Sequence, residues 1–207
     1  MTFADQASFA RALASVFHGA APGSWVSLIG SLGAGTADEY SDIDLAWVVP
    51  DGAVPRCAEW LGEVLGAVAE VAAVRSVPEF QRSGLRRLVF VRFRGVPLFW
   101  RLDLQIWAAS HAFDDTVDAD NPEARGDNWS LLESAAMNAL AACKAVLRGL
   151  PDTADSLLSR GFERIDETDR GGDRSRRIAA LADAAASRDP QLRELAGGIR
   201  TLVPDLP

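Results

Sequence analysis

Hydrophobic and polar residues follow one another along the first half of the chain in a pattern that predicts helices and strands in mixed order. Apolar residues recur at every third or fourth position over residues 3–18, which is the spacing of an amphipathic helix. Two short apolar strands are predicted at 25–31 and 41–49, and a helix that opens on a proline follows at 55–74. Two further strands are predicted on either side of a tight turn at Gly95.

The second half of the chain shows a different pattern. Residues 108–128 have no period and carry six acidic residues against one arginine. Beyond them, apolar residues again recur at helical spacing. The helices predicted there cover residues 129–149, 152–162, 174–187 and 190–200. This order indicates an α+β fold, in which a mixed β-sheet with flanking helices is followed by a C-terminal helical unit.

The change of pattern divides the chain into three predicted parts. These are a sheet domain over residues 1–110, an acidic connecting loop over 111–128 and a helical domain over 129–207. Six acids less one arginine give the loop five of the eight net negative charges of the chain. It is interpreted either as a solvated linker or as a docking surface for a polycationic ligand.

Two aspartates occupy a strand that otherwise looks buried. Alternate side chains of a strand share a face, so Asp42 and Asp44 point to one side while Ile43 and Leu45 point to the core. The same alternation in the last predicted strand places Asp103 on a polar face. Buried carboxylates that converge from neighbouring strands are costly unless a cation neutralises them.

Two interpretations of these three carboxylates remain open. In the first they bind magnesium, which prefers oxygen ligands, and a pair of such ions about 3.5–4 Å apart can serve an in-line phosphoryl or nucleotidyl displacement. In the second, Asp42 caps a turn and the other two acids pair with arginines such as Arg92, Arg94 or Arg101.

The loop before the aspartates favours the first interpretation. Gly30 and Ser31 end a predicted strand, and the small residues 33–36 follow. Glycines let backbone N–H groups approach a phosphate, a serine hydroxyl can donate to a phosphate oxygen, and a helix that begins there adds a favourable dipole. Groups suited to phosphate therefore precede groups suited to a metal ion by about eleven residues.

The stretch GSLGAGTADEYSDIDL, residues 30–45, resembles the signature of the DNA polymerase beta-like nucleotidyltransferase superfamily. The resemblance covers residues 25–49, and a third carboxylate on a later strand, which Asp103 fits, also belongs to the family pattern. The chain looks closest to the small bacterial aminoglycoside-type and minimal nucleotidyltransferases. The resemblance implies the nucleotidyltransferase fold, a mixed sheet with flanking helices that is followed by a helical domain.

The same resemblance implies roles for individual residues. It implies that Asp42, Asp44 and Asp103 are both the metal ligands and the catalytic residues. The implied nucleotide contacts are Gly30, Ser31, Ser41 and, on an alanine-rich helix, Lys144, which is the only lysine of the chain. Many relatives have an arginine in the loop after Gly-Ser, where this chain has none at 32–34, so one positive contact with phosphate is either missing or supplied from elsewhere.

The function implied is a magnesium-dependent nucleotidyltransferase that moves AMP from ATP, or another nucleoside monophosphate from its triphosphate, to a hydroxyl of a small cationic acceptor. An aminoglycoside is such an acceptor, and its modification would confer antibiotic resistance. One alternative is a protein-modifying, antitoxin-type enzyme, and another is a catalytically inactive nucleotide-binding or interaction protein of the same fold. The acceptor, the nucleobase, the oligomeric state and the role of Asp103 as metal ligand, general base or both are left open.

Charge and composition bear on the binding partners and the cellular location of the protein. A net charge of −8 argues against general nucleic-acid binding. No membrane span and no secretory signal are visible, so a cytoplasmic location without membrane attachment is predicted. Cys57 and Cys143 are too few for a disulfide framework or a four-cysteine zinc site, and both are expected to be buried thiols.

Overall fold

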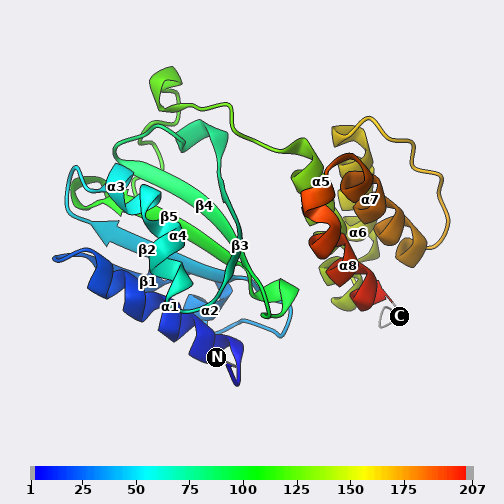
Figure 1. The fold of residues 1–207 in the computed structure, drawn as a ribbon, viewed down its shortest axis with the longest axis horizontal. Helices are drawn as coiled ribbons and strands as arrows, with labels where there is room; N and C mark the ends of the chain where they lie inside the picture. The colour runs from blue at the N-terminus through cyan, green and yellow to red at the C-terminus, as the bar shows by residue number, and fades with distance from the viewer. Residues whose placement is uncertain (1–2, 204–207) are drawn as a thin grey trace. The chain divides into compact units, whose positions relative to one another are not determined.

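A computed structural model describes residues 3–203 and divides the chain into two compact units. The first unit ends at Trp129 and the second begins at Ser130. Within the described residues, the first unit holds a five-stranded sheet with helices against it, and the second unit is helical. The predicted α+β class, with a mixed sheet, flanking helices and C-terminal helices, is therefore confirmed (Figure 1).

The sheet is mixed, and its strand order is β1-β2-β5-β4-β3. The strands are β1 (Trp25–Leu28), β2 (Ile43–Val49), β3 (Val71–Ser76), β4 (Arg86–Phe93) and β5 (Leu102–Ala108). β2 and β5 run parallel, and every other pair of neighbours is antiparallel. Because β2 and β5 begin at the same edge of the sheet, residues at the start of either strand lie close to one another.

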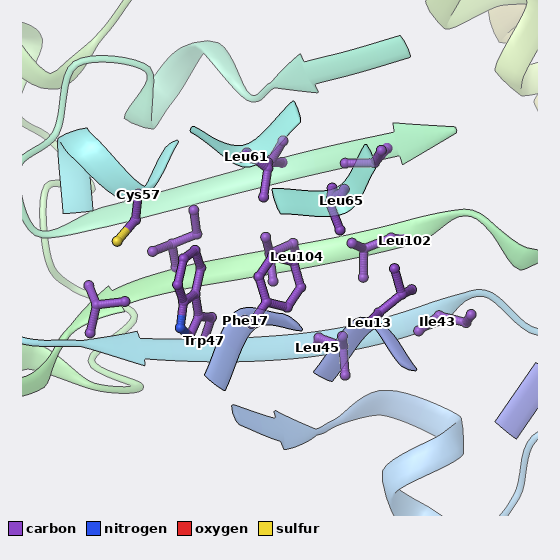
Figure 2. Close-up of a cluster of buried hydrophobic side chains, with 14 of the residues drawn as sticks. Leu13, Phe17, Ile43, Leu45, Trp47, Cys57, Leu61, Leu65, Leu102 and Leu104 are labelled. Atoms are coloured by element: carbon purple, nitrogen blue, oxygen red, sulfur yellow. The ribbon is translucent and has the colours of Figure 1, made fainter. Parts of the chain in front are cut away.

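Helices cover one face of this sheet and form the main core with it. They are α1 (Gln6–Ala20), α3 (Val54–Glu59) and α4 (Leu61–Gly66). Figure 2 shows side chains of these helices meeting those of β2 and β5, and the ring of Phe17 lies 4.8 Å from that of Trp47. The indole N–H of Trp47 donates to the hydroxyl of Ser24 at 3.0 Å, so this large side chain is buried without an unsatisfied donor.

The opposite face of the sheet carries a much smaller apolar cluster. Its buried members are Ala46, Val48 and Trp107. The remaining positions of β2 and β5 on this face are polar, as the strand alternation predicts. The candidate site therefore lies on the face that α1, α3 and α4 leave uncovered.

The predicted helix over 55–74 is wrong in its second half. Helix α3 ends at Glu59, α4 ends at Gly66, and residues 71–76 form the edge strand β3. The run Val-Ala-Ala-Val fits helical and strand spacing equally well over so short a stretch. This segment forms a strand because it pairs antiparallel with β4, where Val74 lies opposite Val91.

The second unit consists of helices that agree with the predicted ones. They are α5 (Leu131–Leu147), α6 (Pro151–Arg164), α7 (Arg174–Arg188) and α8 (Arg193–Leu202), with a 3₁₀ turn at Pro190–Leu192. Small residues let the helices approach closely. A Cβ atom at Gly161 of α6 would lie 2.4 Å from Leu181 Cδ2 of α7, so any larger residue there would force the buried Leu181 side chain to shift.

An ion-pair network joins α6, α7 and the loop between them. Arg177 donates to Asp155 at 2.5 Å and to Asp169 at 2.7 Å, and Arg174 donates to Asp155 at 2.6 Å. The hydrogen bond from Arg177 lowers the pKa of Asp169 below its ordinary value of 3.8. The hydrogen bond from Arg174 likewise lowers the pKa of Asp155.

We expect the second unit to lose stability in acid. A carboxyl whose pKa is lowered by folding stabilises the fold above its unfolded pKa, and this contribution disappears as the pH falls below about 4. Denaturant unfolding followed by far-UV circular dichroism should show this loss. All six tryptophans lie at or before position 129, so their fluorescence reports the first unit separately. Arg177→Gln should weaken the dependence of the helical signal on acid, and an acid dependence equal to that of the parent would contradict the role of the network.

No helix in the described part of the chain combines the length and the apolar character that crossing a bilayer requires.

Candidate functional site

Asp44 and Asp103 face each other across the parallel pair of strands. Each is the second residue of its strand, β2 or β5, and the strand register pairs them directly. Their neighbours Ile43, Leu102 and Leu104 lie in the main core, so the two carboxylates point to the opposite face. Neighbouring strands are about 4.8 Å apart, which brings two acids of the same sign into contact range.

Arg101 connects Asp103 to the third predicted acid, Asp42. The Nε–H of Arg101 donates to Asp42 Oδ2 at 2.8 Å, and its Nη2 donates to Asp103 Oδ2 at 3.0 Å. At most a quarter of each of these side chains is exposed: 25% for Arg101, 18% for Asp42 and 17% for Asp103. A backbone bond of 2.9 Å from the N–H of Ile43 to the carbonyl of Arg101 holds the two strand starts together.

Burial changes the acidity of the two facing carboxyls. It raises the pKa of Asp103 from the ordinary 3.8 to about 6, while Arg101 opposes this shift and the charge of Asp44 adds to it. Burial also raises the pKa of Asp44, and Arg101 again opposes the shift. Both shifts come mainly from burial, and that of Asp103 also includes repulsion from Asp44, so a cation bound here would favour the ionised forms.

Gly30 lies directly against the Asp44 side chain. Its φ of +59° is in the left-handed region. A Cβ atom there would lie 2.2 Å from Asp44 Oδ2 and 2.9 Å from Asp44 Cβ. The N–H of Ile29 donates to the carbonyl of Asp44 at 3.0 Å and keeps the chain in this close approach. Only a glycine permits this backbone to lie over the carboxylate.

Ser31 belongs to α2 (Gly30–Ala34), a single helical turn that packs against β2 and β1. A Cβ atom at Gly33 would come within 2.5 Å of the carbonyl oxygen of Leu28, which explains a second small residue in the loop. The carbonyl of Ser31 accepts from the N–H of Thr36 at 2.9 Å. Ser31 thus follows the residue that covers Asp44, and its predicted contact with phosphate stays a prediction.

Ser41 supports the loop before β2. Its side chain is buried, and its hydroxyl donates to Asp38 Oδ1 at 2.8 Å and accepts from the Asp38 N–H at 3.0 Å. Its carbonyl accepts from the side-chain amide of Gln6 on α1. These bonds hold the chain in place ahead of Asp42, and the predicted contact of Ser41 with a nucleotide stays a prediction.

Lys144 lies on α5 in the second unit. It is half-buried beside the buried residues Cys143 and Ala145. Its predicted contact with a triphosphate stays a prediction.

Sequence reasoning missed an aromatic and cationic surface next to the acids. Phe90 of β4 lies opposite Asp103 in the strand register. The ring of Trp129 approaches that of Phe90, with 6.4 Å between centroids, and the guanidinium of Arg75 lies 4.0 Å from the Trp129 centroid. Alternate residues of β4, namely Val89, Val91 and Phe93, lie in the core. This alternation was the sequence signal that could have placed Phe90 on the face of the acids.

The acidic segment 111–128 is attached to the first unit rather than free between two domains. Asp115 pairs with Arg86 at 3.2 Å, and the guanidinium of Arg86 stacks on Trp107 at 4.5 Å. Asp127 pairs with Arg82 at 3.3 Å. The side chains of Asp115 and Asp127 nevertheless remain 85% and 92% exposed. The segment therefore offers negative charge to solvent while its backbone stays tied to the sheet.

The chemistry of the acids fits a hard divalent cation, but their arrangement is not that of three ligands around one ion. Carboxylate oxygens are the ligands that magnesium prefers. Oδ1 of Asp103 is buried and has no hydrogen-bond partner among the described residues, so a ligand there would satisfy it. In the same part of the chain, no group of three or more histidine, cysteine or acidic side chains is arranged to hold a metal ion. Asp44 and Asp103 can serve as two ligands, since magnesium usually takes one or two carboxylates and completes its shell with water and phosphate.

The site thus combines two facing carboxylates, a third carboxylate joined to Asp103 through Arg101, and a glycine whose backbone lies against the Asp44 side chain. Compared with known proteins, the chain matches no protein-family model, and no curated protein is similar enough to count as a relative.

Proposed function

We propose that this protein is a magnesium-dependent nucleotidyltransferase with the fold of the DNA polymerase beta-like superfamily. It moves a nucleoside monophosphate, AMP from ATP in the first place, to a hydroxyl of a second substrate. One observation carries the proposal: Asp44 and Asp103 face each other in register at the start of two parallel strands, under the close approach of Gly30. The mixed sheet with flanking helices and a following helical unit supports it.

The reaction needs a base, a cation site and a place for phosphate. An oxygen of the acceptor hydroxyl bonds to the α-phosphorus, the bond from that phosphorus to the bridging oxygen breaks, and pyrophosphate leaves. The carboxyl of Asp103 is suited to receive the hydroxyl proton, because burial raises its pKa to about 6, closer to neutrality. Asp44 and Asp103 would hold the magnesium ion, which supplies neutralisation of the charge that develops on the phosphates.

The acidic segment supports a cationic acceptor. Asp115 and Asp127 present exposed carboxylates at the surface of the unit that holds the site. An aminoglycoside, which carries several amines and hydroxyls, has the matching charge. A protein hydroxyl is the other acceptor to be tested.

Transfer is tested with ATP that is labelled on either the α- or the γ-phosphate, together with magnesium and a panel of aminoglycosides and protein acceptors. We expect the α-label on the acceptor and the γ-label in pyrophosphate. Asp44→Asn serves as the control that should keep the fold and lose the transfer. ATP binding by the parent without movement of either label to any acceptor would contradict the enzymatic proposal.

That last outcome is the second candidate function, a nucleotide-binding protein of the same fold without catalysis. Arg101 favours it, because this side chain already forms ion pairs with both Asp42 and Asp103 and so offsets part of their negative charge. The labelled transfer separates the two functions, since both predict ATP binding and only one predicts a product.

We expect Lys144→Met to reduce kcat/KM for ATP about ten- to a hundredfold, the loss of a charge-assisted contact worth about 1.5–3 kcal/mol. Methionine keeps most of the apolar stem, so the melting temperature should change little. Arg148→Met, one turn further along at the end of the same helix, is the matched control and should keep parental kinetics. Parental kinetics in Lys144→Met would show that the second unit does not contribute this cation to the nucleotide.

A further inference from the structure

We propose that Arg101 occupies one of the two cation positions of the acid cluster, so that the site takes one divalent ion and one arginine instead of two divalent ions. This inference rests on the proposed function, because it concerns the cations that the same site uses. It differs from the two-ion arrangement that three carboxylates suggest from the sequence alone.

The guanidinium sits where a bridging cation would sit. It donates from Nε to Asp42 at 2.8 Å and from Nη2 to Asp103 at 3.0 Å, and so joins two carboxylates that come from different strands. It also lies 5.5 Å from the centroid of the Phe90 ring. A planar guanidinium with several fixed donors can hold two carboxylates at once, which a compact ammonium does poorly.

The two carboxylate oxygens of Asp103 have different surroundings. Oδ2 is used by Arg101, whereas Oδ1 is buried without a hydrogen-bond partner among the described residues. Asp44 lies opposite Asp103 in the strand register, and the hydrogen bonds that Arg101 donates to acids within the described residues go to Asp42 and Asp103. One cation position, between Asp42 and Asp103 Oδ2, is thus filled by the protein itself, and the other, at Asp44 and Asp103 Oδ1, suits a metal ion.

The charges agree with a single divalent ion. Three ionised carboxylates carry three negative charges and Arg101 returns one positive charge, which leaves two negative charges. One divalent ion neutralises these in a partly buried corner, whereas a second ion would add an excess of positive charge beside a guanidinium, which is unfavourable at low dielectric. The absence of a three-ligand metal arrangement among the described residues fits the same conclusion.

The number of bound ions tests the inference. Mn²⁺ is titrated into the nucleotide-free protein and followed by electron paramagnetic resonance, which counts free ions. We expect one bound ion in the parent and two in Arg101→Gln, because the glutamine vacates the second position. Arg101→Lys keeps a positive charge there and should bind one ion, as the parent does. Arg94→Gln, which removes a charge from an exposed arginine paired with Glu70, is the matched control and should also bind one.

The number of Mn²⁺ ions bound by each variant supports or overturns the inference. Two ions in the parent, or a single ion in a folded Arg101→Gln, would overturn the inference and leave the proposed function standing. If Arg101→Gln does not fold, two ions in Arg101→Lys would overturn the inference, and one ion in the parent and in Arg101→Lys would support it. Failure of the parent and all variants to bind Mn²⁺ would overturn the inference together with the cation site of the proposed function. Loss of the parent's bound ion in Asp44→Asn would place that ion at the acids.

Discussion

We expect Gly30→Ala to lower nucleotidyl transfer about a hundredfold and to destabilise the first unit by about 3 kcal/mol. The alanine would hold a left-handed φ of +59°, and its methyl group would lie 2.2 Å from Asp44 Oδ2 and 2.6 Å from Asp44 Cγ. The carboxylate would have to move, and a displacement of about 1 Å at a reacting centre can cost a hundredfold in rate. Urea unfolding followed by tryptophan fluorescence measures the stability of this unit.

Gly35→Ala separates the two effects. Gly35 ends the same short helix with a φ of +70°, so alanine meets the same backbone strain, but its Cβ would have nothing within 4 Å. It should cost about 1 kcal/mol and leave transfer unchanged. Equal losses of activity in the two variants would show that backbone strain in the loop, and not the place of Gly30 over Asp44, controls the site.

We expect Asp44→Asn to lose about a thousandfold in transfer, comparable with the removal of one preorganised electrostatic group from an active site. The fold should survive. Burial raises the pKa of Asp44, so above the ordinary value of 3.8 its ionised form costs folding free energy that a neutral amide does not cost. Without magnesium the variant should therefore be at least as stable as the parent at neutral pH.

The stability difference should depend on magnesium. Saturating magnesium should stabilise the parent, which holds the ion through Asp44, and should stabilise Asp44→Asn less. A variant that turns over at a near-parental rate would remove Asp44 from the mechanism. A variant that unfolds would show instead that the carboxylate is a structural partner.

Much of the first unit could be predicted because strand alternation is a strong signal when one face is buried. Ile43 and Leu45 go to the core and Asp44 goes to the other face, as their phase requires. The edge strand β3 could not be predicted, because Val71–Ser76 is short and its partner β4 lies further along the chain. Its hydrogen-bonding partner, and not its own periodicity, makes it a strand.

The site was predictable as a set of residue types but not as a network. The sequence places Asp103 in phase with the other acids. It cannot show that Asp103 and Asp44 are register partners, because β5 pairs with β2 although two helices and two strands separate them along the chain. Arg101 lies two residues before Asp103 on the same face, so it was available as a counter-ion, but so were Arg92 and Arg94. Only the geometry selects Arg101 as the arginine that joins Asp42 to Asp103.

The most direct test of the central claim is the anomalous scattering of manganese in crystals grown with Mn²⁺ and an ATP analogue that cannot release pyrophosphate. We expect an anomalous peak within about 2.5 Å of carboxylate oxygens of both Asp44 and Asp103, with the triphosphate beside it and the chain at Gly30 next to the phosphates. A nucleotide bound elsewhere on the protein, or manganese bound away from these two aspartates, would contradict the assignment of this corner of the sheet as the site of nucleotidyl transfer.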